Sequence, residues 1–264
     1  MPYITTRDNT RLYVKDWGSG RPVILTHGWP LSADTWDEAA MAIANAGFRA
    51  IAYDRRGFGR SDQPLDGYNY DTLADDLAAV IAETGATDAT IVGFSMGGGE
   101  VARYMSRHGG RNVAQAALIA SVVPYMLQTP DNPNGVPQAT YDQIMAGLKE
   151  DRAKFFTGFF RDFYGVGLVS HPVSNEVIEW SRNVAMKAGV PGTLGCAQAF
   201  STTDFRPDLA AFNVPTLIVH GTDDSIVPIA TSARQAAAAL PNATVIEYEG
   251  APHGLFATHK ERLT

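Results

Sequence analysis

The sequence has a single cysteine, Cys196, among its 264 residues. One cysteine cannot form an intramolecular disulfide, and disulfides are typical of proteins that work outside the reducing cytoplasm. The first residues, Met1 to Asp8, have neither the basic start nor the apolar core of a secretory signal. We therefore expect a cytoplasmic protein.

Long apolar runs and an excess of basic charge are also missing. No apolar run reaches the roughly 18 residues that a membrane-spanning helix needs. Lys and Arg number 21 against 28 Asp and Glu, which gives a formal net charge of −7, and neither sign is gathered in a block. Binding to nucleic acid or to an anionic membrane surface is therefore disfavoured.

Motifs for metals and redox cofactors are absent from the sequence as well. There is no H-x-H, no H-E-x-x-H and no cysteine pair, so neither a metal nor haem is expected. Gly57 and Gly59 begin a pattern like that of dinucleotide-binding loops, but Asp62 occupies the position of its third glycine. We predict a protein that works without a cofactor.

The sequence does contain enough apolar residues for a large core, since 45% of the chain is hydrophobic and 19% is charged. Short apolar runs alternate with amphipathic stretches, which predicts strands buried on both faces, separated by helices, in a parallel sheet. The predicted strands are 22–26, 50–53, 90–93, 117–120, 216–219 and 244–248, and the predicted helices are 35–46, 72–84, 96–107 and 231–240. An antiparallel hairpin that turns at Asp8-Asn9 is predicted at one edge of this sheet.

From about Pro124 to Thr203 the alternation of strand and helix stops. Helical patterns are found at 141–149, 152–164, 174–187 and 194–201. We predict one α/β domain, with a core of 1–123 and 204–264 and an inserted helical cap of 124–203. Phenylalanines fall on two adjacent stripes of the second helix, at 155, 159 and 163 and at 156 and 160. Either both stripes pack inside the protein, or one packs on the body and the other lines a pocket.

The strand predicted at 90–93 leads into Gly93-Phe94-Ser95-Met96-Gly97, a G-x-S-x-G motif between a strand and a helix. A nucleophile on so sharp a turn needs small residues two positions before and after it, because larger side chains would collide with the strand and the helix. Ser95 is therefore the predicted nucleophile. The free N–H groups at the start of the helix favour an anion, so the Met96 N–H is a predicted oxyanion donor.

A base and an orienting carboxylate should follow later strands, in the order nucleophile, acid, base. His253 lies in the loop after the last predicted strand and is the predicted base. His27 and His220 also end strands, and we expect them to hold loops through hydrogen bonds. The carboxylate should follow 216–219, where Asp223 and Asp224 are adjacent. Spacing alone does not distinguish between these two aspartates.

The second oxyanion donor should come from the loop after the strand at 22–26. The Trp29 N–H is the predicted donor, because the next residue, Pro30, has no N–H and can only stiffen the loop. A backbone donor of this kind is worth about 2.7–4 kcal/mol of transition-state stabilisation.

Together these motifs resemble the α/β-hydrolase family, and within it the bacterial aryl esterases and the cofactor-free haloperoxidases, also called perhydrolases. The resemblance rests on 27–29 (HGW), 54–61 (DRRGFGRS), 93–99 (GFSMGGG), 204–208 (DFRPD) and 251–254 (APHG). It implies a mostly parallel eight-stranded sheet flanked by helices. It also implies that Asp224 is the acid, three residues after Gly221 in G-x-x-D-x-x-V-P, while Asp223 is a loop residue. The resemblance also implies that Pro30, which follows the tryptophan, modestly favours perhydrolysis over ester hydrolysis.

We thus predict a serine hydrolase that cleaves short-chain or aryl esters through an acyl-enzyme on Ser95, with hydrogen peroxide as a second co-substrate that yields a peracid. The residues predicted to form an apolar substrate pocket are Pro30, Val122, Met126, Ile144, Phe159, Phe163 and Ile226. The alternatives are an amidase or γ-lactamase with the same triad, and a non-catalytic ligand-binding hydrolase fold. The resemblance further implies a homo-oligomer and a closing helix that continues beyond 263–264.

Overall fold

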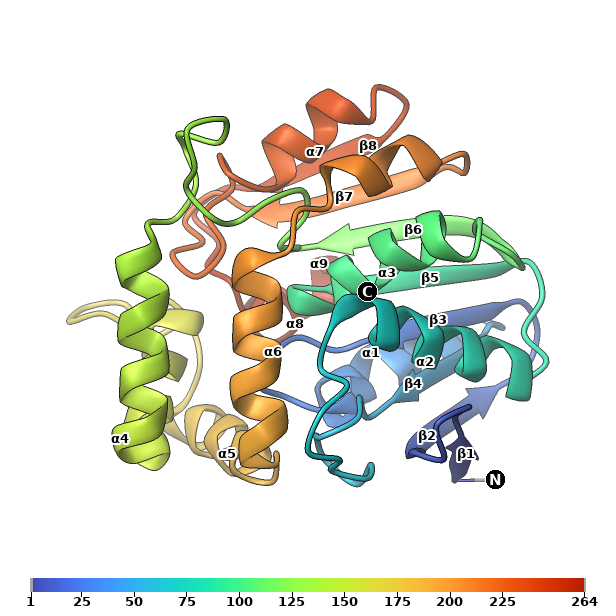
Figure 1. The fold of residues 1–264 in the computed structure, drawn as a ribbon, viewed down its shortest axis with the longest axis horizontal. Coiled ribbons are helices and arrows are strands. Elements are labelled where there is room, and N and C mark those ends of the chain that lie inside the picture. Colours follow the sequence, from blue (N-terminus) through green and yellow to red (C-terminus); the bar gives the residue numbers. More distant parts are fainter. Residues whose placement is uncertain (1, 264) are drawn as a thin grey trace.

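The computed structural model describes residues 2–263. At its centre lies one eight-stranded sheet in the order β1-β2-β4-β3-β5-β6-β7-β8 (Figure 1). The strands are β1 (Tyr3–Thr5), β2 (Arg11–Gly18), β3 (Pro22–Thr26), β4 (Arg49–Tyr53), β5 (Ala89–Phe94), β6 (Val113–Ile119), β7 (Thr216–Gly221) and β8 (Thr244–Tyr248). The strand β2 pairs antiparallel with β1 and β4, and all the other neighbours are parallel. The predicted sheet and its N-terminal hairpin are confirmed.

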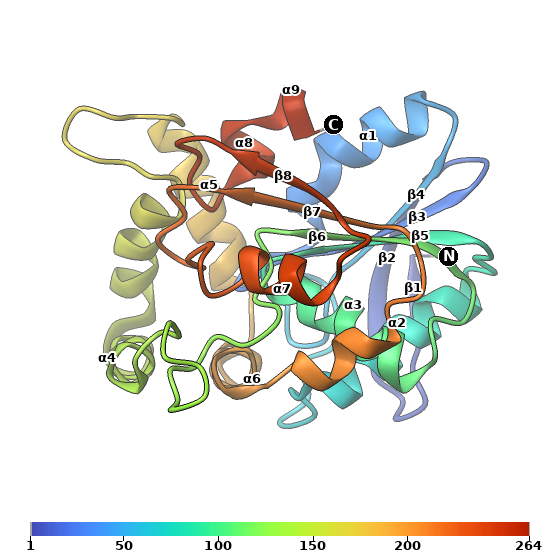
Figure 2. The ribbon, with the colours of Figure 1, turned by 90° about the horizontal axis from the view of Figure 1, so that it is seen from above.

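Helices cover both faces of the sheet (Figure 2). On one face lie α1 (Asp37–Asn45), α8 (Leu255–Thr258) and α9 (Lys260–Leu263), and on the other lie α2 (Tyr70–Glu83), α3 (Met96–Arg107) and α7 (Ala233–Ala239). Two short 3-10 helices, Ala33–Trp36 and Arg206–Ala211, complete the core. The predicted continuation of the closing helix through Thr264 falls outside the described residues. Within residues 2–263 no helix combines the length and the apolarity needed to cross a bilayer.

One strand differs from its prediction. We expected 244–248 to be buried on both faces, but Val245 is 41% and Ile246 37% exposed. The reason is topological, because β8 is the last strand of the sheet and pairs only with β7. An apolar run identifies a strand without telling whether it is central or at an edge.

The segment between β6 and β7 is helical and lies beside the carboxyl ends of the strands (Figure 1). It contains α4 (Gln138–Phe163), α5 (Asn175–Met186) and α6 (Val190–Thr202). Two of the predicted helices are merged in α4, with a kink at Asp151, where φ is −154° and ψ is 91°. The division of the chain into core and cap at 124 and 203 stays a prediction.

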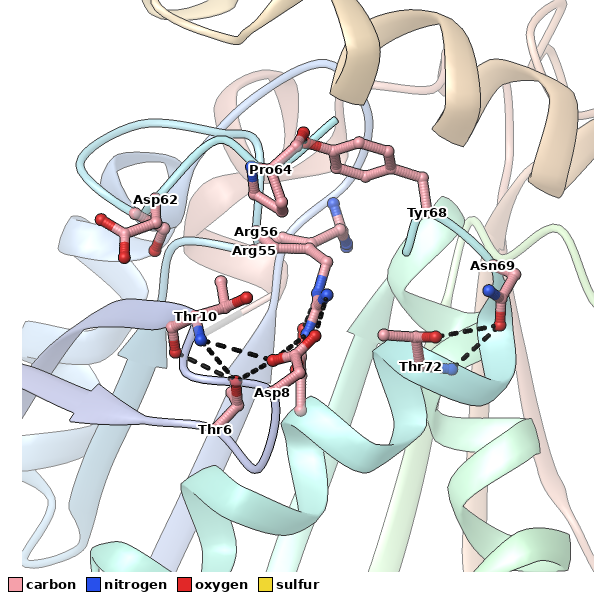
Figure 3. A network of polar contacts seen from close by, with 12 residues as sticks. Thr6, Asp8, Thr10, Arg55, Arg56, Asp62, Pro64, Tyr68, Asn69 and Thr72 are labelled. Atoms are coloured by element: carbon pink, nitrogen blue, oxygen red, sulfur yellow. Dashed lines mark hydrogen bonds and ion pairs between the residues drawn. The ribbon is translucent and has the colours of Figure 1, made fainter. Parts of the chain in front are cut away.

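A buried arginine attaches the N-terminal hairpin to the core. Arg56, only 2% exposed, donates to both carboxylate oxygens of Asp76 in α2, each at 2.6 Å. It also donates to Asp8 in the hairpin turn at 2.8 Å, and Asp8 accepts the Thr10 N–H in turn (Figure 3). Two carboxylates thus compensate one desolvated guanidinium, which fixes the turn against α2.

Candidate functional site

Ser95 stands on a strained turn between β5 and α3. Its backbone has φ 55° and ψ −120°, and its N–H donates to the Ile119 carbonyl at 2.8 Å. A Cβ on Gly93 would lie 2.5 Å from the Gly97 carbonyl oxygen, so only glycine allows β5 and α3 to approach so closely. The sequence motif therefore produces the sharp turn that was predicted from it.

Three side chains from separate loops form one hydrogen-bonded chain. Ser95 Oγ lies 2.9 Å from His253 Nε2, and His253 Nδ1 lies 2.6 Å from Asp224 Oδ2. Because an ionised carboxylate can only accept, the imidazole proton is on Nδ1. The lone pair of Nε2 then faces the serine hydroxyl, which is the arrangement that general-base activation requires.

The carboxylate of Asp224 is held ionised although it is buried. Its Oδ1 accepts the N–H groups of Ile226 at 3.0 Å and Val227 at 2.8 Å. Burial alone would raise the pKa of Asp224, but its contacts with the imidazoles of His253 and His220 lower it to about 2. Asp223, in contrast, is exposed, and its N–H donates to the Ala251 carbonyl. The structure therefore brings Asp224, and not Asp223, to His253.

The two predicted oxyanion donors come from the starts of different segments. Met96 is the first residue of α3, so its N–H has no acceptor within the helix. Trp29 lies in the loop after β3, where the preceding Gly28 carbonyl accepts the Leu31 N–H at 3.0 Å and lies 2.9 Å from His27 Nδ1. A peptide group is planar, so fixing this carbonyl also fixes the direction of the Trp29 N–H.

A buried ion pair supports this loop from behind. Arg55 and Glu100 are each 1% exposed and form a salt bridge, and Tyr53 donates to Glu100 at 2.5 Å. Arg55 also donates to the His27 carbonyl, and its backbone N–H donates to His27 Nε2 at 3.0 Å. Burial and the charge of Arg55 hold the pKa of His27 well below its usual value, so His27 is neutral. His27 holds this loop through hydrogen bonds, in agreement with the prediction for it.

A cavity of about 790 Å³ opens at Ser95. Of the residues predicted to form a pocket, the wall includes Val122, Met126, Ile144, Phe159 and Ile226. Sequence reasoning missed several further aromatic residues of the wall, namely Trp29, Tyr141, Phe155 and Phe200. The wall is therefore mostly apolar and aromatic, and much of it belongs to α4 and α6.

Two predicted pocket residues are not part of this wall as the described chain forms it. Pro30 is buried in the loop after β3, where it follows a cis peptide bond. Phe163 is fully buried and packs edge-on against the His253 ring, with the ring centroids 4.9 Å apart. Because α4 turns Phe163 towards the body together with Phe156 and Phe160, only Phe155 and Phe159 of the other stripe reach the cavity.

Tyr141 carries a buried hydroxyl for which residues 2–263 supply no hydrogen-bond partner. An unpaired buried polar group costs free energy, so Tyr141→Phe is expected to raise the free energy of unfolding by about 1 kcal/mol, as measured by urea denaturation. The matched control is Tyr164→Phe, because the Tyr164 hydroxyl lies 2.7 Å from Ser181 Oγ and its removal breaks a buried hydrogen bond. A loss of stability in both variants would contradict the assignment for Tyr141.

The lone thiol and the acidic side chains do not suggest other chemistry. Cys196 is fully buried, and burial raises the pKa of its thiol to about 12, so it is not a reactive thiolate. In the part of the chain that the structure describes, no group of three or more His, Cys, Asp or Glu side chains could hold a metal ion.

Comparisons with known proteins agree with this architecture. Residues 21–260 match the model of the family described as the alpha/beta hydrolase fold. The chain is 45% identical to a non-heme haloperoxidase of Rhodococcus erythropolis, over 97% of this chain and 93% of that protein. It is 42% identical to a bifunctional esterase/perhydrolase, DCH, of Acinetobacter calcoaceticus, over 100% of this chain and 96% of that one.

Among solved structures, the bromoperoxidase of Bacillus anthracis superposes with a TM-score of 0.95 at 41% identity, covering 99% of this chain and 96% of the other. The relatives therefore match this chain over nearly its whole length, including the helical segment between β6 and β7. The chain belongs to the α/β-hydrolase family, in the group of the non-heme haloperoxidases and esterase/perhydrolases.

Proposed function

We propose that the protein is a serine esterase that also performs perhydrolysis, with Ser95, His253 and Asp224 as its catalytic triad. The observation that carries this proposal is the hydrogen-bonded chain from Ser95 Oγ through the imidazole of His253 to the buried carboxylate of Asp224. The carboxylate of Asp224 can only accept a hydrogen bond, which supports a proton on His253 Nδ1 and leaves Nε2 free to accept the proton of Ser95, as acyl transfer requires.

In the first half-reaction, Ser95 Oγ attacks the carbonyl carbon of the ester while its proton passes to His253 Nε2. The imidazolium that forms is stabilised by Asp224 through the 2.6 Å hydrogen bond to Nδ1. The tetrahedral intermediate then collapses, the C–O bond to the alcohol breaks, and His253 gives its proton to the leaving oxygen. An acyl-enzyme on Ser95 and a free alcohol remain.

The negative charge that develops on the carbonyl oxygen would be held by the N–H groups of Met96 and Trp29. Support for Met96 comes from its place at the N-terminus of α3, and support for Trp29 comes from the fixed Gly28 carbonyl on the same peptide. Both donors are backbone groups, so no side-chain reorganisation is needed when the charge appears.

In the second half-reaction, His253 deprotonates water, which releases the acid and restores Ser95. Hydrogen peroxide attacking the same acyl carbon releases a peracid instead, and a peracid can oxidise halide in solution to hypohalous acid while it becomes the carboxylic acid. The haloperoxidase and esterase/perhydrolase relatives support both outcomes on one site. No redox cofactor is required for this route.

The apolar, aromatic cavity supports short-chain or aryl esters as substrates. Phe159→Ala is expected to enlarge the cavity and to change the ratio of kcat/KM for a longer acyl ester over an acetate by about tenfold. Phe163→Ala, the matched control in the same helix, should cost about 3–5 kcal/mol of stability with that ratio unchanged, because Phe163 packs in the core. Aryl acetates and hexanoates assayed alongside urea denaturation measure both effects. Equal selectivity in wild type and Phe159→Ala would contradict this role.

The reaction class is tested by covalent labelling. An organophosphonate is expected to give one adduct, mapped to Ser95 by mass spectrometry of the digested protein, and to abolish aryl esterase activity. Turnover of an aryl ester, a γ-lactam and the ester with hydrogen peroxide then separates an esterase/perhydrolase from an amidase. The absence of an adduct on Ser95 would contradict the proposed mechanism and would favour the alternative of a non-catalytic ligand-binding protein.

A cytoplasmic location and a homo-oligomer are further proposals. The location is supported by the single, buried and unpaired Cys196, which is compatible with a reducing compartment. The expected partners are a small-molecule ester and hydrogen peroxide.

A further inference from the structure

A second imidazole reaches the carboxylate of Asp224. His220 is the next-to-last residue of β7 and is 1% exposed. Its Nε2 lies 2.8 Å from the Val227 carbonyl oxygen and 3.2 Å from Asp224 Oδ2. A carbonyl and an ionised carboxylate both accept hydrogen bonds and cannot donate. The His220 proton is therefore on Nε2, which donates to the Val227 carbonyl oxygen and lies beside Asp224 Oδ2.

The other ring nitrogen defines the charge of His220. Its Nδ1 is buried, and residues 2–263 offer it no hydrogen-bond partner. A proton on Nδ1 would place an unpaired donor in the protein interior, which costs free energy. His220 is thus a neutral donor through Nε2.

The N–H of His220 helps to fix the backbone of the loop that carries Asp224. The N–H of Val227 donates to Asp224 Oδ1, while the carbonyl of the same residue accepts from His220. Both peptide groups that flank the Val227 side chain are therefore fixed to the carboxylate or to the imidazole. Ile226 and Val227 also form part of the cavity wall, so the same contacts shape the site next to Ser95.

We propose that His220 is a positioning residue for acyl transfer, whose Nε2–H holds Asp224 Oδ2 towards His253 Nδ1 and withdraws part of its negative charge. This inference rests on the proposed function of the triad. Oδ2 accepts from His253 Nδ1 and lies 3.2 Å from His220 Nε2, while Oδ1 accepts two backbone N–H groups, so the carboxylate is held at both oxygens. The loss of His220 would free one side of Oδ2.

Two measurable effects should follow from that loss. A carboxylate free to rotate spends less time in line with His253, which lowers kcat. Negative charge concentrated on Oδ2 also stabilises the imidazolium of His253, which raises the apparent pKa of the base. The charged and titratable groups that face His220 are Asp224 from its own loop, His253 beyond it, and Glu247, its partner in β8.

The test compares His220→Leu with His220→Gln, because the glutamine amide can donate from nearly the position of Nε2. For His220→Leu we expect kcat on an aryl ester to fall about tenfold with KM little changed, and the acidic limb of the kcat/KM profile to move up by about 0.5 pH unit or more. His220→Gln should keep kcat within about threefold of wild type and leave the limb in place. Glu247→Gln controls for nearby surface charge and should leave both unchanged.

A second measurement is independent of turnover. The proton between His253 Nδ1 and Asp224 gives a low-field NMR signal, which should move in His220→Leu and stay in His220→Gln. The proposal is overturned if both variants lose the same activity with an unmoved acidic limb and an unmoved signal, or if His220→Leu is as active as wild type. Activity retained by Ser95→Ala would instead overturn the proposed function itself, so the two failures are distinguishable.

Discussion

Replacing Ser95 with alanine is expected to lower kcat for an aryl ester by about 10⁶-fold, the scale on which loss of a triad nucleophile acts in serine hydrolases. The reason is that no other hydroxyl takes its place 2.9 Å from His253 Nε2 among the hydrogen bonds of the described residues. The remaining rate would come from the oxyanion donors and from binding alone. Steady-state kinetics with a chromogenic ester, at enzyme concentrations high enough to see the residual rate, measures this loss.

The control for this variant is Ser19→Ala, which removes an exposed serine and should leave kcat unchanged. The Ser95→Ala protein should fold normally, because alanine meets the same backbone strain at φ 55° as serine does. A second, independent preparation excludes contamination by wild-type enzyme. If the residual activity then exceeds one thousandth of that of wild type, another nucleophile carries the reaction.

Replacing Glu100 with alanine is expected to destabilise the protein by about 3–5 kcal/mol. Glu100 is the carboxylate partner of the fully buried Arg55, and its removal leaves a desolvated positive charge and an unpaired Tyr53 hydroxyl. For a domain of this size such a loss is a large part of the total stability. Urea denaturation at neutral pH, with the midpoint and the slope fitted separately, measures it.

Two further variants make this result specific to a buried charge. Glu247→Ala breaks the exposed pair with Arg234 and should cost no more than about 1 kcal/mol. The double variant Arg55→Met with Glu100→Leu replaces both charges with apolar groups and should recover much of the stability lost in Glu100→Ala. If Glu100→Ala lowers the free energy of unfolding no more than Glu247→Ala does, the prediction is wrong. Arg55, which is 1% exposed in the structure, would then be hydrated in the variant.

Local patterns predicted the parts of the molecule that depend on neighbouring residues in the chain. The run of apolar residues before Gly93 and the glycines around Ser95 determine a strand, a tight turn and a helix within a short segment. A predicted base such as His253 could also be located, because strand order limits which loops meet at the carboxyl edge.

Other features depend on which way a side chain points. Asp223 and Asp224 have the same neighbours in sequence, and only the resemblance to known hydrolases distinguished them before the structure showed Asp223 exposed. Phe159 and Phe163 lie one helical turn apart, yet the first lines the cavity and the second packs behind His253. A small rotation of α4 about its axis would exchange these roles, and helical periodicity does not fix that rotation.

Contacts between residues that are distant in the sequence could hardly be predicted from it. The partners Arg55 and Glu100 are 45 positions apart, and a charged residue is expected at the surface unless its partner is known. The one hint was position: Glu100 directly follows three glycines in a helix that must pack closely on the sheet. The contact of His220 with Asp224 was equally hidden, because it depends on how the loop 221–227 folds back.

The helical insertion between β6 and β7 has a consequence for how this scaffold can diversify. The proposed triad residues Ser95, Asp224 and His253 lie in the loops that follow β5, β7 and β8. In contrast, Phe155, Phe159 and other aromatic residues of the cavity wall belong to the inserted helices. Mutations of cavity residues in α4 or α6 can therefore alter which ester fits, while the side chains of the proposed triad keep their geometry. A new substrate preference can therefore evolve through changes in the inserted segment alone, while the protein keeps its catalytic activity.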